Sequence, residues 1–356
     1  MSRIGENIYK RKDGRWEGRY RIQGTKKYGS VYAHTYSEVR DKLILEKANQ
    51  LKYEPESYSL KMYCLEWLEW KKVRIKCSSY NKYKNLVDSY IIPYFNSLSF
   101  LELDHFKIES FTNYLLKRNL SSKTINDTLS VLRQIIQYGN INNSAGIQIS
   151  INIKGISSSE QKELQVLTSS QQAILYSYCK ENMNDKNLGI LICLFTGIRI
   201  GELCALKWDD ISIVDHTLRI DKTMQRIQTH GTPKTIISIT KPKSQCSIRT
   251  IPLCDEIYEL LKKNKKTGYV LSGNEKYVEP RSMQTYFKKV TKACNIEQVN
   301  FHCLRHSFAT RCVESGFDVK SLSEILGHAS VNITMNRYVH PSMDLKRQNM
   351  QRLNQF

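Results

Sequence analysis

The sequence has few of the features that mark secreted, membrane-spanning or metal-binding proteins. Its first residues, MSRIGENIYKRKDGRW, contain no apolar stretch like that of a secretory signal, so we expect a cytoplasmic protein. The longest apolar run, 189–195, is too short to cross a bilayer. The ten cysteines form no C-x-x-C pair, and the eight histidines complete no zinc-ligand spacing. We therefore expect reduced thiols in the core, no metal site, no cofactor and no membrane partner.

Negative charge is also scarce, since 54 Lys and Arg residues face only 34 Asp and Glu residues. The resulting net charge of +20 favours a polyanionic partner, because cationic side chains that bind phosphates release condensed counterions. Nucleic acid is the leading candidate. The 40% hydrophobic content is typical of globular proteins, and 356 residues are enough for two or three domains.

The first part of the chain, 1–52, reads as a small DNA-binding domain of three strands and one helix. Its strands are separated by turn signals at Asp13-Gly14 and near Gly24, and Thr35 to Glu38 form a capping box that opens a helix. In 16–23, side chains alternate between an apolar face and a polar face that includes Glu17. A β-ribbon can enter the major groove of DNA. The basic residues expected to contact DNA there are Arg15, Arg19, Arg21, Lys26 and Lys27. A solvated basic sheet without a DNA role is the alternative.

The second part, 57–142, reads as an all-helical domain. We expect four helices, at 60–73, 79–91 (or 80–91), 104–117 and 121–138, with Pro93 ending the second. The stripe Leu65, Trp67, Leu68 and Trp70 is interpreted as core.

The fourth helix opens with hydroxyl side chains at Ser121 and Ser122, which can cap it. Its first amides, with Lys123 and Thr124, can then meet a DNA phosphate. A capped helix without a DNA contact is the alternative. The polar stretch 143–163, with serines at 157–159, is interpreted as an interdomain linker.

The last part, 164–356, reads as a mostly helical α+β domain with a small antiparallel sheet. Helices are expected at 171–183, 187–196, 254–264, 280–293, 301–315 and 319–326, and strands at 217–221, 235–240 and 248–253.

This part holds an ordered set of groups suited to attack a phosphodiester, namely Arg199, Lys243, His302, Arg305, His328 and Tyr338. Five of them can be cationic, and the sixth is a phenol. Cationic donors stabilise the charge that gathers on the phosphate oxygens in the transition state more than they stabilise the ground state.

Local patterns indicate how some of these side chains are presented. Gly197 is expected to end the preceding helix, so that Arg199 projects into a cleft with Glu202 orienting its guanidinium. His302 and Arg305, three residues apart on a helix, share one face. His306 is expected to project elsewhere and to be structural.

Two of the groups are less well fixed by local pattern. Lys241 and Lys243 are two residues apart and share a strand face, so periodicity cannot choose between them. Tyr338 is one of 21 tyrosines. Ionising a free phenol at pH 7 costs about 4 kcal/mol, so a nearby base and two arginines must offset that cost.

Three sequence boxes in this part resemble the signature boxes of the tyrosine recombinase (phage integrase) family. They are TGIRIGELCALKWDDI, HCLRHSFAT and LGHASVNITMNRY, and KPKSQCSIRTIPL resembles the family's lysine hairpin. SSKTIN and IIPYF are weaker matches to its helical core-binding (SAM-like) domain, and the N-terminal sheet is similar to the arm-binding domain of integrases from temperate phages and conjugative transposons.

The resemblance implies a role for each group. Arg199 and Arg305 clamp the scissile phosphate, with Glu202 behind them, and Tyr338 attacks it to give a 3′-phosphotyrosyl link. His302 accepts the phenol proton, and His328 donates a hydrogen bond to the phosphate. A lysine protonates the leaving 5′-oxygen. Lys243 is favoured for this role, and Lys241 is the alternative.

The implied protein is a bacterial site-specific recombinase that integrates and excises a mobile element without metal or ATP. It acts as a homotetramer on core and arm-type DNA sites, with an excisionase or a host DNA-bending protein, and is nucleoid-associated when bound. The alternatives are an Xer-type chromosome or plasmid resolvase and a DNA-binding regulator with an unused active site. Xer-type proteins usually lack an N-terminal sheet domain.

Overall fold

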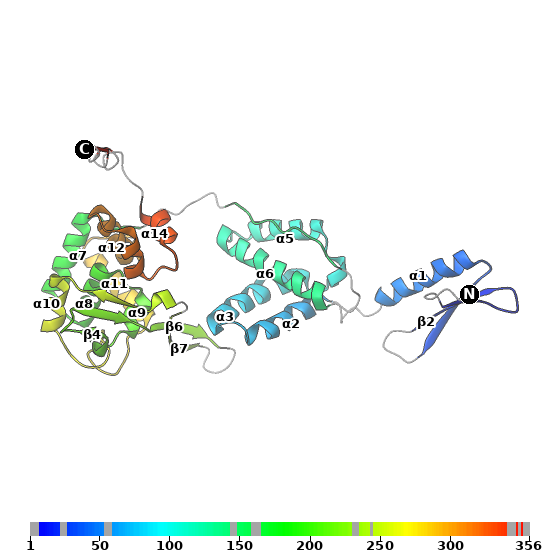
Figure 1. Ribbon diagram of the computed structural model, residues 1–356, viewed down its shortest axis with the longest axis horizontal. Coiled ribbons are helices and arrows are strands. Elements are labelled where there is room, and N and C mark those ends of the chain that lie inside the picture. Colours follow the sequence, from blue (N-terminus) through cyan, green and yellow to red (C-terminus); the bar gives the residue numbers. More distant parts are fainter. Residues whose placement is uncertain are drawn as a thin grey trace. The chain divides into compact units, whose positions relative to one another are not determined.

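The computed structural model describes residues 7–21, 27–52, 59–142, 148–157, 165–229, 235–242 and 245–339, together with Arg347, Met350 and Gln351. The chain divides into two compact units, Met1–Glu160 and Gln161–Phe356. The first unit holds a small sheet with one helix and then a helical part, and the second is a mostly helical α+β unit (Figure 1). This confirms the predicted fold class.

The N-terminal part is an antiparallel sheet of three strands with one helix. The strands are β1 (Ile8–Lys10), β2 (Trp16–Arg21) and β3 (Tyr28–Ala33), in the order β1-β2-β3, and α1 (Tyr36–Lys52) follows. Thr35 and Glu38 form the predicted capping box, in which each backbone N–H donates to the other side chain at 3.3 Å. Val39 and Leu43 of α1 are buried with Ala33, and this small core joins the helix to the sheet.

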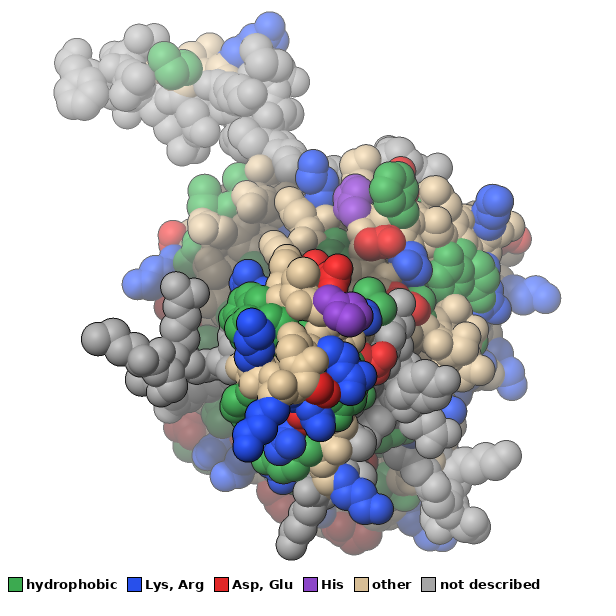
Figure 2. Space-filling view, turned by 90° about the vertical axis from the view of Figure 1, so that its right-hand side faces the viewer, with side chains coloured by type: hydrophobic (Ala, Val, Ile, Leu, Met, Phe, Trp, Pro, Cys, Tyr) green, Lys and Arg blue, Asp and Glu red, His purple; other side chains and the backbone are tan. Residues whose placement is uncertain are grey.

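The polar face of β2 carries a buried carboxylate. Glu17 shares this face with Arg19 and is buried there. It accepts from Arg19 at 2.8 Å, from Arg11 at 3.1 Å and from Ser30 at 3.1 Å. The basic neighbours on that face therefore gather over a single carboxylate. Figure 2 shows Lys and Arg side chains beside single Asp and Glu side chains on this part.

The helical part contains α2 (Leu60–Lys72), α3 (Cys77–Leu86), α4 (Ile92–Phe95), α5 (His105–Lys117) and α6 (Ser122–Asn142). The expectation that Pro93 ends a helix at Ile91 was wrong. A π-helical turn, Val87–Ile91, links α3 directly to α4, and Ile92 N–H donates to Val87 O. Proline is tolerated in the first turn of a helix, and Pro93 lies in the first turn of α4.

The apolar stripe of α2 was only partly predicted. Trp67 and Leu68 are buried, whereas Leu65 and Trp70 are 42% and 40% exposed. The buried positions of α2 follow the three- and four-residue spacing of one helix face, which turns Leu65 and Trp70 away from the core.

Part of the polar stretch after α6 packs on the helical part. In 148–157, Ile153 is buried, and Asn126 of α6 exchanges two hydrogen bonds with the backbone of Ile156 at 2.8 and 2.9 Å. Asn140 does the same with Ile149. Since the division between the two compact units falls at residues 160 and 161, these ten residues belong with the first unit.

The second unit surrounds the apolar helix α8 (Asp185–Thr196). The other helices are α7 (Ser169–Glu181), α9 (Ile200–Ala205), α10 (Asp255–Lys263), α11 (Pro280–Ala293), α12 (Cys303–Glu314), α13 (Val319–Leu326) and α14 (Val331–Tyr338). An antiparallel sheet has the order β4 (Ile211–Ser212), β5 (Thr217–Ile220), β8 (Arg249–Pro252), and β6 (Thr223–Gln228) pairs with β7 (Thr235–Thr240). No helix among the described residues has the length and hydropathy needed to span a membrane.

Candidate active site

The end of α8 presents the first arginine of the site. Gly197 ends this helix with φ of 65°, a left-handed conformation that glycine adopts without strain. Arg199 then stands at the N-cap of α9, and both its backbone N–H and its Nη1 donate to the Glu202 carboxylate at 2.9 Å. The predicted contact between Glu202 and Arg199 is therefore present.

Arg305, on α12, is the second arginine and is only 3% exposed. Its Nη1 donates to Gly197 O at 2.8 Å, and its Nη2 donates to Leu326 O at 2.7 Å. Burial and the neighbouring charge of Arg199 lower the pKa of Arg305 to about 9. The guanidinium is thus cationic at neutral pH and held on two backbone carbonyls.

A third arginine, Arg249 of β8, completes the cluster and was not predicted. It is 9% exposed, and its Nη2 and Nη1 donate to the two carboxylate oxygens of Glu202 at 2.9 and 3.2 Å. Burial acts to raise the pKa of Glu202, but the hydrogen bonds and charge of Arg249, followed by the charge of Arg199, lower it overall. Glu202 therefore stays ionised between two guanidinium groups.

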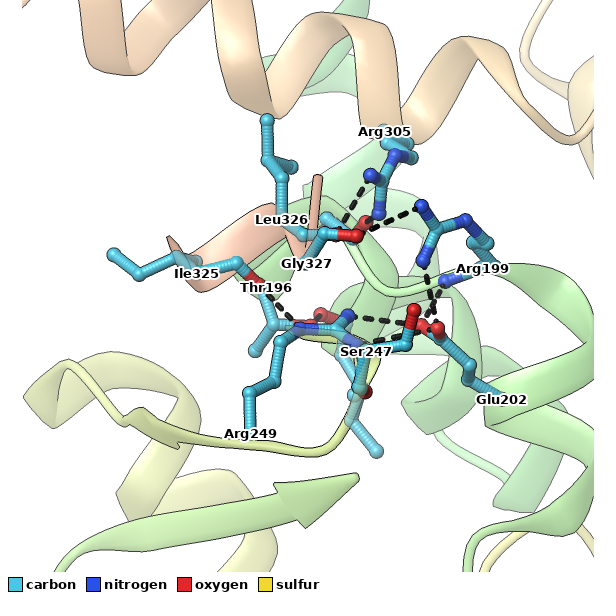
Figure 3. A network of polar contacts seen from close by, with 11 residues as sticks. Thr196, Arg199, Glu202, Ser247, Arg249, Arg305, Ile325, Leu326 and Gly327 are labelled. Carbon is cyan, nitrogen blue, oxygen red and sulfur yellow. Dashed lines mark hydrogen bonds and ion pairs between the residues drawn. The ribbon is translucent and has the colours of Figure 1, made fainter. Parts of the chain in front are cut away.

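All three arginines meet at the C-terminal end of α13 (Figure 3). Ile325 O accepts from Arg249 Nε at 2.6 Å, Leu326 O from Arg305 at 2.7 Å, and Gly327 O from Arg199 Nη2 at 3.3 Å. The last carbonyls of a helix have no partner inside the helix and carry its partial negative charge. The end of α13 therefore fixes three guanidinium groups in one place.

Tyr338 is the last residue of α14 and is 7% exposed. Its hydroxyl lies 2.8 Å from Nδ1 of His306, which is also buried. Burial raises the pKa of Tyr338, while the positive charges of Arg305 and Arg337 act to lower it. The expectation that His306 projects elsewhere was wrong, because α14 packs across α12 and brings the phenol to it.

His302 and His328 lie beside this pair. The His302 ring stands edge-on to that of His306 at 4.6 Å between centroids, and the His328 ring is parallel to that of Tyr338 at 6.4 Å. Nδ1 of His328 is hydrogen-bonded to Thr334 Oγ1 at 2.7 Å. Desolvation and the charges of Arg305 and Arg199 lower the pKa of His302 to about 4 and that of His328 to about 3. Both rings are therefore neutral at pH 7.

Five of the six predicted groups are thus brought together from four segments of the second unit, namely Arg199, His302, Arg305, His328 and Tyr338. Lys243 lies outside the described residues, and Lys241 follows β7 with its side chain exposed. The described part of the chain holds no group of three His, Cys, Asp or Glu side chains that could bind a metal ion.

The predicted DNA contacts of the first unit lie in its two separate parts. Arg15, Arg19, Arg21 and Lys27 are all exposed, and Arg15 also pairs with Asp13 at 2.9 Å and Arg19 with Glu17. Lys26 lies outside the described residues. On α6, Lys123 is exposed and Thr124 is capped by Ser121, whose Oγ accepts from Thr124 N–H at 3.2 Å.

Residues 165–344 match the phage integrase family, and residues 59–116 match its N-terminal SAM-like domain. The chain therefore belongs to the phage integrase family.

Among curated relatives, the chain is 29% identical to a XerC-like tyrosine recombinase of Caldanaerobacter subterraneus subsp. tengcongensis, over 66% of each chain. It is 29% identical to the transposase from transposon Tn916 of Enterococcus faecalis, over 53% of this chain and 51% of the relative. The matches thus span between about half and two thirds of these relatives.

Solved structures share the fold. The Tn1549 transposon integrase in complex with transposon right end DNA has a TM-score of 0.68 at 22% identity, with 82% of this chain and 99% of that one covered. A lambda integrase tetramer bound to a Holliday junction has a TM-score of 0.58 at 18% identity, with 95% and 98% covered.

Proposed function

We propose that the protein is a tyrosine site-specific recombinase that cuts and rejoins double-stranded DNA to integrate and excise a mobile element. The observation that carries this proposal is the meeting of Arg199, Arg305 and Tyr338 around the end of α13. Two fixed guanidinium groups beside a buried phenol are suited to one reaction class, the attack of a protein oxygen on a phosphodiester.

In this mechanism Arg199 and Arg305 bind the non-bridging oxygens of the scissile phosphate. Their forked donors match two oxygens at once, and their positions are set before DNA binds because each also donates to a backbone carbonyl. Each is expected to stabilise the transition state by about 3 kcal/mol, as a donor of an oxyanion hole does. His328, held by Thr334, donates to the same phosphate.

Tyr338 Oη attacks the phosphorus and displaces the 5′-oxygen, so that a 3′-phosphotyrosyl bond replaces the phosphodiester. The leaving oxygen takes a proton from Lys243, with Lys241 as the alternative, and the resemblance assigns the phenol proton to His302. Because the covalent link keeps the energy of the broken bond, rejoining requires neither ATP nor a metal ion.

The partners we propose are core and arm-type DNA sites, a homotetramer on those sites, and an excisionase or a host DNA-bending protein. The net charge of +20 and the DNA in the solved neighbours support DNA as a partner. The lambda integrase tetramer supports the homotetramer. Two relatives, the Tn916 transposase and the ICEBs1 integrase of Bacillus subtilis, favour a conjugative element as the mobile element that carries the gene. We place the protein in the bacterial cytoplasm, on the nucleoid when bound to DNA.

The test uses nicked suicide duplexes cut from the junctions of the element that carries the gene, incubated with the protein in EDTA. A covalent adduct on a denaturing gel that is absent with Tyr338→Phe is the expected result. Binding without any adduct contradicts the proposal and favours a regulator. Recombination of chromosomal dimer sites instead of element junctions would favour an Xer-type resolvase. This is the second candidate because one relative is a XerC-like tyrosine recombinase.

A further inference from the structure

The hydroxyl of Tyr338 is hydrogen-bonded to a histidine other than the one that the sequence boxes assign to it. Its Oη lies 2.8 Å from Nδ1 of His306, and both side chains are buried. A proton acceptor must lie within hydrogen-bond reach of the proton that it removes, and this pair meets that condition in the DNA-free protein.

His302 has a different position. The residue is exposed, and its ring is perpendicular to the His306 ring, with 4.6 Å between their centroids, while the Tyr338 ring centroid lies 5.7 Å from that of His306. Besides burial, the charges of Arg305 and Arg199 lie close enough to lower the pKa of His302, so it stands near the phosphate-binding arginines.

The surroundings of His306 keep its ring unprotonated before the reaction. Burial, followed by His302, Arg337 and Arg305, lowers its pKa to about 4, so the ring is neutral at pH 7. These charged groups come from α12 and α14, the helices that contribute His306 and Tyr338. A neutral imidazole with its hydrogen on Nε2 presents a lone pair at Nδ1, where the phenol lies.

We infer that His306 is a catalytic residue that takes the phenol proton as Tyr338 attacks and returns it when the DNA is rejoined. This inference rests on the proposed function. As the Tyr338 Oη–P bond forms and the P–O5′ bond breaks, the phenol proton moves to Nδ1 and gives an imidazolium. In the rejoining step the 5′-hydroxyl returns its proton to the lysine as its oxygen attacks the phosphorus, the Tyr338 Oη–P bond breaks, and the departing phenolate recovers the proton held by His306. His302 is left to contact the phosphate.

The experiment measures single-turnover formation of the covalent adduct by His306→Asn on the suicide duplex. The Asn amide can hold the Tyr338 hydroxyl but cannot take its proton, so we expect a rate about 100-fold lower, within the usual range for a lost general base, with unchanged DNA binding. His306→Gln serves as a second variant if His306→Asn unfolds. An adduct formed by the unsubstituted protein establishes the proposed function separately from these variants.

Two substitutions of the reacting groups then distinguish loss of a base from loss of structure. A trifluorotyrosine at position 338, whose phenol ionises more easily, should restore most of the rate of His306→Asn. A duplex with sulfur in place of the bridging 5′-oxygen should not restore the rate of His306→Asn, because that sulfur assists only the departure of the 5′ leaving group. A wild-type rate in His306→Asn and His306→Gln overturns the inference. Rescue by trifluorotyrosine in His302→Asn instead of in the His306 variants also overturns it.

Discussion

Arg249 connects the elements that position the arginines of the site. It lies between the Glu202 carboxylate and the carbonyl of Ile325, and so connects β8 to both α9 and α13. Removing one partner of a buried ion pair leaves the other charge without compensation, which is far more damaging than the loss of an exposed pair. The Glu202 carboxylate is 3% exposed and would lose the partner that binds both of its oxygens through side-chain donors, keeping only its contacts with Arg199 among the described residues.

We therefore expect Arg249→Met to lower the free energy of unfolding by about 3–5 kcal/mol. It should also reduce adduct formation, because Glu202 then holds Arg199 less well. Thermal unfolding and the suicide-duplex assay measure the two effects. Arg219→Met on neighbouring β5 is the matched control, since its side chain is 64% exposed and its pairing with Asp221 is weak. Equal losses in the two variants would contradict this view of Arg249.

The residues of the site differ in how far the sequence could predict them. Arg199, His302, Arg305, His328 and Tyr338 were predicted from boxes that keep a fixed order. Arg249 was missed, although a signal existed, because it shares the inward face of β8 with Ile251, and a charge on the apolar face of a strand needs a buried partner. The contact of His306 could not be predicted, since it depends on where α14 crosses α12.

At the scale of elements, the C-terminal turn of α13 organises the site. Gly327 ends this helix with φ of 63°, and a Cβ there would lie 3.0 Å from Arg249 Nη1. The turn thus needs glycine both for its conformation and for the space that the arginine fills.

For this reason Gly327→Ala should destabilise the second unit by at least about 1–2 kcal/mol, the usual cost of the left-handed conformation, and should also reduce adduct formation. Gly316→Ala is the control, because Gly316 has φ of 79° but nothing within 4 Å of an added Cβ. That variant should show the stability loss alone. Retained cleavage in Gly327→Ala would show that the packing of Arg249 beneath the turn is unimportant.

The N-terminus of α6 carries a second prediction at this scale. Lys123 is exposed in the first turn of α6, where backbone N–H groups favour an anion. If it binds a DNA phosphate, Lys123→Ala should weaken binding to all sequences similarly and reduce the slope of log K against log salt by about 1. Lys117, near the end of α5, provides a control position. An unchanged slope would favour the alternative of a capped helix without a DNA contact.

Elements were predicted best where one pattern dominates locally. The capping box of α1 and the glycine at the end of α8 were predicted because a few adjacent residues determine them. The continuation of the helix past Ile91 to Pro93 was not predicted, since the π-helical turn depends on how α3 and α4 pack within the helical core. The short strand β4 and helix α9 were missed because each is too short to show a period.

For the molecule as a whole, acid should reduce stability well above the usual range of carboxylates. The folded protein lowers the pKa values of His306 and His328 to about 4 and about 3, while an unfolded chain binds these protons near pH 6.5. Between these values the unfolded state binds more protons, so stability falls as the pH falls below about 6.5.

Unfolding midpoints in urea, measured from pH 7.5 to 5, should therefore decline across this window. The double variant His306→Asn, His328→Asn should show a flatter dependence, because Asn does not titrate. A midpoint that stays constant down to pH 5 in the unsubstituted protein would contradict neutral burial of these rings.

The way in which the end of α13 gathers its arginines also bears on the order of protein synthesis. Arg199, Arg249 and Arg305 come from well-separated points in the chain, and all three donate to carbonyls at residues 325–327, shortly before Tyr338. A chain that ends before this turn therefore lacks both the anchor for its arginines and the nucleophile. A prematurely terminated product should have none of the proposed cleavage activity.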